Sequence, residues 1–526
     1  MAGEALKLFP LKASPGIKRD TTDTEGNYYS QGQWSRFYRG LPRSIGGYRS
    51  MSETYYGPSR GLLVNPNGSG YLNIFSGSAS NLVVGQFTSS GFGNSPVDIT
   101  PSGFTGSSNN VWQMDLIYDA QGSGTSLIIA HAAPNLSAID SNVVQPVYYG
   151  NVNGTSALTA TQNDSAATFS IDGGIVCIPP FVIAYGSNGL VCWSQIIGGQ
   201  NPAVFPVANA ANVCATKIVK GLSLRGGAPA CLLWSLDCVI QMSYTGGSTV
   251  WNFSTLSDQS SILSSSGVVE YDGVYYWPGI DRWLTFNGSL HELPNLMNLD
   301  FFYSNLNYAQ RQKVFGFKVP RWGEIWWCAP MFGATECNWA FIYNVRENTW
   351  YDTPLPSDGR SAAYFADTWQ YPIMSSANGL VPIGANTGLN YPLYQHELGT
   401  DFVRGNQINA IDSYVLSPTI SLVGGGLSAF GGAIAQQENV FTEYAFFEPD
   451  FKFGNNLMFS VYGRMYPQDA DTLLNQTTIT QQSMNNHYDL QVQARYLRWK
   501  IESNSQGGFY VMGQPLISYR TGDRQA

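Results

Sequence analysis

The sequence predicts an all-β protein, namely a β-propeller of six or seven blades with a C-terminal β-sandwich and an extended N-terminal arm. Three observations lead to this prediction. Short runs of β-branched and aromatic residues alternate with Gly, Asn and Asp turns, most clearly from Ile262 to Pro356. Aromatic residues make up 14% of the chain and charged residues only 12%, whereas the surfaces of helices need many Lys, Glu and Arg. The 56 glycines also suit a fold with many tight turns.

The first element is the N-terminal arm, residues 1–55. It is polar, is interrupted by Gly and Pro, and holds a strand-like stretch, QWSRFYRG, but no apolar core of its own. Such a segment has to pack on the following domain or on a neighbouring subunit. Because it is basic and rich in aromatic residues, we expect it to mediate assembly. The candidate interface residues are Trp34, Arg36, Phe37 and Arg39.

The second element is the body, residues 56–404. Hairpin-rich units recur roughly every 40 to 50 residues, which is the length of a four-stranded propeller blade. Several units share one order: a strand, a Gly turn, an aromatic strand, another turn and a further strand. Six or seven blades account for the available residues, and the last, weaker unit starts near Ser361. Two stacked β-sandwiches are the alternative arrangement.

The third element is the C-terminal domain, residues 405–526. Its strands are longer and alternate apolar with polar residues, as in ARYLRWKIE, which is typical of a sandwich. The Gly-rich stretch GGGLSAFGG reads as a flexible connection, because glycine imposes little conformational preference.

The charge distribution favours a subunit of a larger assembly. Few surface charges protect a chain of 526 residues poorly against association. The net charge of −9 argues against a protein that grips nucleic acid through its phosphates. It is compatible with a conduit, because a weakly negative wall repels phosphate and prevents sticking. A generic acidic protein would, however, have the same composition.

Residues with reactive or metal-binding chemistry form no recognisable motif. The seven cysteines lack CxxC spacing and mostly lie in apolar runs, so we expect reduced, buried thiols. The four histidines are far apart, and no nucleophile elbow or phosphate-binding loop is present. We therefore expect no catalytic residue, no metal and no cofactor. We also expect no signal peptide and no membrane insertion, because long apolar runs are missing.

Carboxylates and tryptophans leave a carbohydrate-directed function open as an alternative. A glycosidase needs two carboxylates that converge on the scissile bond. The candidates are all expected at turns: Asp272, Asp281, Glu324, Glu347 and Asp352. Six tryptophans could stack on sugars, although large aromatic residues more often fill the seams between blades. They are Trp277, Trp283, Trp322, Trp326, Trp327 and Trp350.

Three stretches of the chain resemble a known family. The opening PGIKRDTTDTEGNYYSQGQWSRFYRGLPRSIGGYRSM is similar to the start of tail or head-to-tail proteins of short-tailed bacteriophages. The central runs VYYWPGIDRWLTFNGSLHELPN, LNYAQRQKVF, EIWWCAP and YNVRENTWY resemble the middle of the same family. The closing RYLRWKIESNSQGGFYVMGQPLISYRTGDR resembles its end. The similarity is patchy between about 55 and 170, where decorations peculiar to one virus would lie.

This resemblance implies a virion structural protein without enzymatic activity, described in the family as a tail nozzle, tail tubular or DNA-stabilising connector. It implies a ring, expected to be a homo-hexamer, around the DNA exit channel near the head-to-tail junction. The implied partners are the portal or adaptor ring, tail fibre or spike proteins, and viral DNA that passes through the lumen without sequence readout. Such a chain is made in the host cytoplasm and retains the packaged genome until ejection.

Two other functions remain open at this point. One is a β-propeller tail protein that binds or cleaves carbohydrate during host attachment. The other is a head-closure plug one ring higher in the particle. A sugar-directed propeller should act as a soluble monomer, whereas a nozzle subunit should be inert alone and form rings with its neighbours.

Overall fold

β-Strands dominate the described part of the chain, as the sequence predicts. The computed structural model describes residues 6–22, 26–52, 57–66, 71–88, 96–108, 110–119, 124–134, 145–163, 169, 171–196, 204–224, 229–247, 249–381, 389–423, 426–429, 440–481 and 487–524. Helical segments in these ranges are short: α1 (Leu299–Asn305), η1 (Ser187–Gly189) and η2 (Tyr308–Lys313). None of the described helices is long and apolar enough to span a membrane.

Six four-stranded antiparallel sheets follow one another along the described body of the chain. The first two contain β8 (Leu62–Pro66), β9 (Leu72–Gly77), β10 (Leu82–Phe87) and β11 (Val97–Asp98), then β12 (Val111–Tyr118), β13 (Ser126–Ala133), β14 (Tyr148–Asn151) and β15 (Thr159–Ala160). The next two contain β17 (Gly174–Ile178), β18 (Phe181–Tyr185), β19 (Leu190–Trp193) and β21 (Ala210–Asn212), then β22 (Ile218–Ser223), β23 (Ala230–Ser235), β24 (Val239–Tyr244) and β25 (Trp251–Ser257). The last two contain β26 (Val269–Tyr271), β27 (Val274–Pro278), β28 (Trp283–Phe286) and β29 (Leu290–Glu292), then β30 (Phe315–Val319), β31 (Glu324–Ala329), β32 (Trp339–Asn344) and β33 (Thr349–Pro354). A short parallel pair, β16 (Gln162–Asn163) and β20 (Val204–Phe205), lies beside the third sheet in sequence.

A seventh sheet joins the end of the body to the N-terminal arm. It contains β34 (Arg360–Tyr364), β35 (Ile373–Ser376) and β36 (Leu393–His396), followed by β7 (Tyr48–Ser52) from the arm. β7 pairs antiparallel with β36, and β37 (Phe402–Arg404) and β38 (Gln407–Asn409) extend the sheet beyond β7. Residues separated by more than 300 positions are therefore hydrogen-bonded neighbours, which no local sequence pattern announces.

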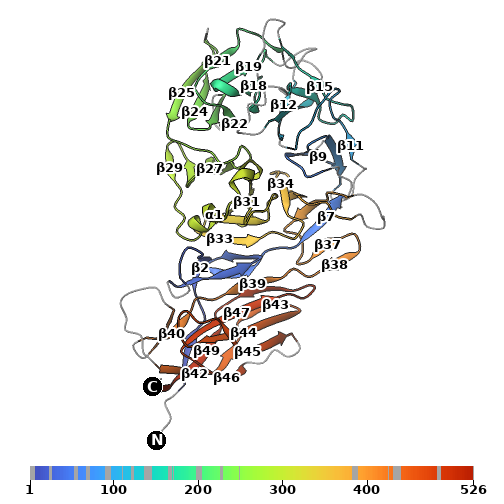
Figure 1. Cartoon of the computed structure of the whole chain (residues 1–526). Coiled ribbons are helices and arrows are strands. Elements are labelled where there is room, and N and C mark those ends of the chain that lie inside the picture. The colour runs from blue at the N-terminus through green and yellow to red at the C-terminus, as the bar shows by residue number, and fades with distance from the viewer. Residues whose placement is uncertain are drawn as a thin grey trace.

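The first strands of the seven sheets meet around a common centre (Figure 1). β8 contacts β12, β12 contacts β17, and β17 contacts β22. β26 contacts β30, β30 contacts β34, and β34 contacts β8, so the series returns to its start. An apolar cluster that includes Trp234 and Trp277 joins the fourth and fifth sheets. Both faces of the inner strands are thus covered, which explains unbroken buried runs such as GIVCI in β17.

The C-terminal strands form three sheets that incorporate the rest of the arm. One sheet has the order β1 (Lys7–Pro10), β49 (Leu516–Arg524), β42 (Val440–Glu448) and β46 (Tyr488–Ala494). A second contains β4 (Gln31–Gln33), β39 (Ser413–Leu416), β47 (Tyr496–Ser503), β40 (Ile420–Val423), β41 (Gly426–Ala429), β44 (Asn456–Arg464) and β45 (Thr472–Thr480). The third contains β43 (Phe451–Gly454), β48 (Phe509–Met512), β6 (Leu41–Ser44) and β5 (Ser35–Tyr38). β2 (Ser14–Ile17) and β3 (Tyr28–Tyr29) form a short parallel pair.

The arm lies between the body and the C-terminal sheets (Figure 1). One large apolar cluster unites Trp34 and Phe37 of the arm, Trp326 of the body, and Phe459 and Trp499 of the C-terminal sheets. The first two C-terminal sheets pack against each other through this cluster. Phe447 of β42 and Phe459 of β44 stack with ring centroids 3.9 Å apart. The arm has no separate core, as expected, because it shares the core of its neighbours.

The cysteines pack as the sequence predicts. All seven thiols are free, and six of them are buried. Burial raises the pKa of Cys192 to about 12, so its thiol stays protonated at neutral pH. These side chains therefore act as small apolar core residues.

Candidate functional site

The β5–β6 hairpin of the arm is clamped to the body at its tip. Its two turn residues, Arg39 and Gly40, have φ angles of 55° and 73°, as a two-residue turn of this kind requires. The backbone N–H groups of both residues donate to the carboxylate of Glu347, with 3.0 Å from Gly40. Glu347 lies in the turn between β32 and β33, so the tip is fixed to the sixth sheet.

Arg36 lies at the centre of a buried ionic network. Its Nε lies 2.8 Å from Oε1 of Glu324, and its Nη1 donates to Oε2 of Glu397 at 2.7 Å. Glu324 also accepts from Trp326 Nε1 at 2.8 Å and from the Tyr351 hydroxyl at 2.6 Å. Burial disfavours the charge of Arg36, but the two carboxylates more than offset this and raise its pKa. The network therefore joins the arm to β31 and to the segment after β36.

Trp34 and Phe37 flank this network with apolar contacts. The Trp34 indole donates to the carbonyl of Gly46 at 3.0 Å, and its ring meets Trp326 edge-on with centroids 6.3 Å apart. Phe37 packs against Tyr351 at 5.4 Å. The arm thus contributes aromatic area on both sides of the buried guanidinium group.

The four predicted interface residues consequently divide into two groups. Trp34, Arg36 and Phe37 are at most 3% exposed and bind the arm to its own chain. Arg39 is exposed at the hairpin tip. Contact with a neighbouring subunit therefore stays a prediction that concerns Arg39, while the other three stabilise the joint.

Three further arginines surround Trp322, close to Arg39. The Cζ atoms of Arg43 and Arg321 lie 4.5 Å and 5.1 Å from the centroid of the Trp322 ring. Arg346 donates to the carbonyls of Pro320 and Arg321 at 2.8 Å and 3.3 Å. We call Arg39, Arg43, Arg321 and Arg346 the arginine patch.

Only Arg39 of this patch was singled out in the sequence analysis, because the other members come from β6 and from two turns of the sixth sheet. A usable signal was present for the buried network. Arg36 lies within an aromatic strand, and Glu324 opens the wholly apolar run that ends at Ala329. Charged residues in such positions are rarely buried without a partner of opposite charge.

The carboxylates considered for glycoside cleavage do not converge. Glu324 and Asp352 were expected at turns, but both are buried within strands, where apolar neighbours flank them. Asp352 pairs with Arg19 at 2.9 Å and accepts from the Trp339 indole at 2.9 Å. Asp272 and Asp281 are exposed at turns. Glu324 and Asp352 thus bind different arginines.

Most of the tryptophans fill seams between sheets, as the sequence analysis favours. Trp277, Trp283, Trp326, Trp327 and Trp350 are at most 3% exposed. Trp283 of the fifth sheet and Trp327 of the sixth lie with centroids 4.5 Å apart. Trp322 alone of the six is partly exposed, and arginines cover it. Five of the six indole rings are therefore too buried to stack on a sugar.

A central cavity of about 480 Å³ is lined by the first strands of all seven sheets. Asp115 of β12, Lys220 of β22 and Tyr364 of β34 face it. Burial raises the pKa of Asp115, although the N–H of Cys177 donates to its carboxylate at 2.8 Å. Burial also lowers the pKa of Lys220. The cavity offers a carboxylate and an amine whose charged forms are both disfavoured, which suits water or another small polar molecule.

No cluster of three or more metal-ligating side chains occurs among the described residues. His131 and His396 are buried, whereas His291 and His487 are exposed and distant from them in sequence. His396 accepts from Arg360 Nε at 3.1 Å and stacks on Tyr48 with centroids 5.0 Å apart.

Comparison with known proteins yields only distant structural likenesses. No protein-family model and no curated protein matches the chain. Among solved structures, it is similar to the extracellular domain of a putative one component system from B. thetaiotaomicron. The two share 11% sequence identity with a TM-score of 0.43. The alignment covers 94% of this chain and 63% of that one, so the chain spans less than two thirds of the other's length. A likeness this low carries no argument about activity.

Proposed function

We propose that this chain is a structural subunit of the tail of a short-tailed bacteriophage, without enzymatic activity, and that it forms a nozzle or head-to-tail connector ring. The proposal rests on one observation. The first and last stretches that resemble the phage family are far apart in sequence but lie together in space. β6 of the opening stretch pairs with β48 of the closing stretch, and Arg498 of the closing stretch contacts Ser30 of the opening stretch.

Side-chain contacts reinforce this adjacency of the two stretches. Ser35 of the arm bonds to the Tyr510 hydroxyl at 2.6 Å, and Tyr29 meets Trp499 edge-on at 5.9 Å. The opening and closing stretches therefore form one structural unit. The central stretch, which contains β31 and β33, contacts that unit through Glu324 and Tyr351.

The proposed fold is a seven-bladed β-propeller that carries a β-sandwich. Six four-stranded sheets, together with β34, β35, β36 and β7, would form the blades. Pairing of β7 with β36 would close the ring of blades by joining the two ends of the body. The C-terminal sheets that stack Phe447 on Phe459 would form the sandwich.

In the particle, six copies would surround the DNA exit channel near the head-to-tail junction, after synthesis in the host cytoplasm. Portal or adaptor proteins would lie above the ring, and fibres or spikes beside it. DNA would pass without sequence readout. The net charge of −9 supports a lumen to which phosphate does not adhere.

Immunogold labelling of the virus that encodes this chain tests the proposal. Fab fragments raised against the recombinant protein should label intact particles at the head-to-tail junction. Label at the tips of fibres would instead favour the carbohydrate-directed alternative. Particles that lack the label and lack the chain by mass spectrometry would overturn a structural role in the virion.

A further inference from the structure

The arginine patch gathers four guanidinium groups near Trp322 and the tip of the β5–β6 hairpin. Arg39, Arg321 and Arg346 are exposed, and Arg43 is half-buried. None of the four guanidinium groups forms an ion pair with a described carboxylate, whereas Arg19, Arg60, Arg464 and Arg520 of the same chain all do.

The acidic groups near the patch are already engaged. Arg36 holds Glu324 and Glu397, and the latter also accepts from the Trp322 indole at 3.1 Å. Backbone N–H groups of the hairpin tip hold Glu347. Burial together with repulsion from Arg36 and Arg321 lowers the pKa of Arg43. The chain therefore holds like charges together here, and Glu397 offsets them only in part.

A surface of opposite charge to the arginine patch occurs on the fifth sheet and on the segment that precedes it. Asp258, Asp281 and Glu292 are exposed, as is Ile280 at 47%. Oδ1 of Asp281 also lies 4.0 Å from Nε of the neighbouring Arg282. The segment after Asp258 is bonded to the turn that holds Asp281, because the N–H of Ile280 donates to Ser261 Oγ at 3.0 Å. β29, which ends at Glu292, pairs with β28, the strand that begins two residues after Asp281. We call Asp258, Asp281 and Glu292 the acidic rim.

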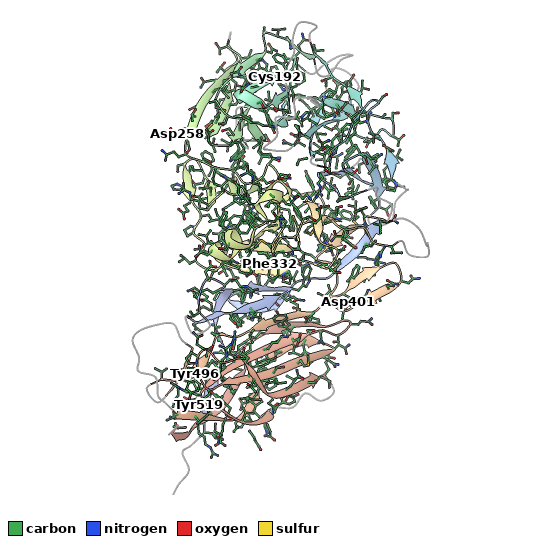
Figure 2. All side chains as sticks on the ribbon, in the orientation of Figure 1. Cys192, Asp258, Phe332, Asp401, Tyr496 and Tyr519 are labelled. Atoms are coloured by element: carbon green, nitrogen blue, oxygen red, sulfur yellow. The ribbon has the colours of Figure 1, made fainter. Side chains whose placement is uncertain are left out.

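The patch and the rim are different surfaces of the molecule. The patch lies at the β5–β6 hairpin and at the turns before β31 and β33 of the sixth sheet, where Arg346 donates to the Tyr271 hydroxyl of the fifth sheet at 3.4 Å. The rim lies on the fifth sheet and on the segment before it, and Figure 2 shows its member Asp258 at one edge of the body. Two different faces that fit each other generate a ring when the rotation between copies closes, because each copy then offers one face to each neighbour.

We propose that the arginine patch of one copy docks on the acidic rim of the next copy, and that this contact builds the ring. The inference rests on the proposed function, which it deepens by naming the contact between copies. Guanidinium groups form bidentate bonds with carboxylates. Trp322 and Tyr38 hold the planar groups of Arg43 and Arg39, with Cζ 4.5 Å and 5.3 Å from the ring centroids, so less side-chain freedom is lost on docking.

A carboxylate-bearing surface fits the patch better than duplex DNA does. A duplex presents many phosphates, and the other surfaces of a chain with net charge −9 repel them. The rim of a second copy offers three carboxylates and one apolar side chain. At physiological salt, charges attract one another over about 8 Å, so these carboxylates act only on a patch that touches them. The contact is therefore local, and the rest of the surface stays acidic.

Charge-swap variants of the full-length chain provide the test. The patch variant is Arg39→Glu, Arg321→Glu, Arg346→Glu, and the rim variant is Asp258→Lys, Asp281→Lys, Glu292→Lys. Each should associate at least about tenfold more weakly than wild type, because like charges then face each other. An equimolar mixture should regain assembly, since a swapped patch fits a swapped rim and the native faces still fit each other.

Sedimentation velocity and mass photometry measure assembly, and thermal melting checks that each variant stays folded. The inference is overturned if the patch variant assembles like wild type, if the mixture of folded variants does not recover, or if wild type fails to self-associate at all. It is also overturned if wild type binds a fluorescent duplex at 150 mM salt and the patch variant does not. Immunogold labelling is independent of these results, so a failed contact and a failed tail assignment remain distinguishable.

Discussion

Arg36 shows how a single buried charge can hold a multi-part chain together. Its side chain is 1% exposed and bridges Glu324 of the sixth sheet and Glu397, which lies between β36 and β37 of the seventh. Removal of one partner from a buried pair leaves the other charge uncompensated, which costs more than the pair itself contributes. The residue therefore matters because Glu324 is fully buried and the Glu397 side chain is only 8% exposed.

We expect Arg36→Met to lower the free energy of unfolding by about 3–5 kcal/mol, since two buried carboxylates lose their cation. Urea unfolding followed by tryptophan fluorescence measures the change. Arg39→Met is the matched control, and its exposed side chain should alter stability by no more than about 0.5 kcal/mol. A triple variant that adds Glu324→Gln and Glu397→Gln should recover part of the loss. Equal effects of Arg36→Met and Arg39→Met would contradict the buried network.

At the scale of elements, the seams between sheets carry much of the packing. Trp327 of β31 lies between the fifth and sixth sheets, where its indole donates to the carbonyl of Gly267 at 2.8 Å. Its ring contacts Trp283 and stacks on Trp350 at 5.8 Å. Gly316 leaves room for it, because a Cβ there would come within 2.9 Å of the indole. The ring therefore fills a seam that no smaller side chain would occupy.

Trp327→Ala should accordingly lower the free energy of unfolding by about 3–5 kcal/mol, through lost transfer energy and the cavity left behind. Thermal and urea unfolding measure this loss. Tyr118→Ala at the end of β12 is the control, because that ring is 59% exposed and should cost no more than about 0.5 kcal/mol. A decrease for Trp327→Ala as small as that of the control would place the indole outside the core.

Strands of the arm act as structural elements of other domains. β1, β4 and β6 each pair with strands from the last quarter of the chain, and β7 completes a sheet of the body. The arm was expected to mediate assembly between subunits. Most of its strands instead connect the body to the C-terminal sheets of the same chain, which leaves the hairpin tip at Arg39 for outside contacts.

At the scale of the whole molecule, two buried histidines make stability depend on pH. Burial lowers the pKa of His131 to about 4 and lowers that of His396 well below its ordinary value. His396 faces Arg360, Tyr48 and Tyr394, and accepts a hydrogen bond from Arg360, so it has to be neutral. Below about pH 6.5 these histidines are protonated in the unfolded chain but stay neutral in the folded chain. The free energy of unfolding therefore falls as pH falls.

We expect each of these histidines to cost roughly 2 kcal/mol of stability between pH 7 and pH 5. Asp412 acts in the opposite direction, because burial and the neighbouring Glu502 raise its pKa to about 6. Urea unfolding of wild type and of His396→Gln at both pH values measures how much of the loss of stability on acidification is due to His396. The variant should lose about 2 kcal/mol less on acidification. An unchanged pH response in the variant would contradict the role of His396, and the exposed His291→Gln serves as control.

Local patterns determined much of this protein without reference to distant residues. Turn residues between short aromatic runs predicted an all-β chain, and the recurring units from about 60 to 400 correspond to successive sheets. Apolar runs around the cysteines and tryptophans predicted their burial, because a strand that is apolar on both faces has to be covered on both. These inferences succeed because they depend on neighbours within a few residues.

Only the tertiary structure decided which distant residues meet. Three features join segments about 300 residues apart. They are the pairing of β7 with β36, the ion pairs of Arg36 with Glu324 and Glu397, and the arginine patch, which brings Arg39 close to Arg321 and Arg346. No periodicity encodes such contacts, since they depend on how whole sheets close around a centre. The sequence thus determined the strands, their buried faces and the charge balance, whereas the closure of the chain on itself determined the joint and the surfaces beside it.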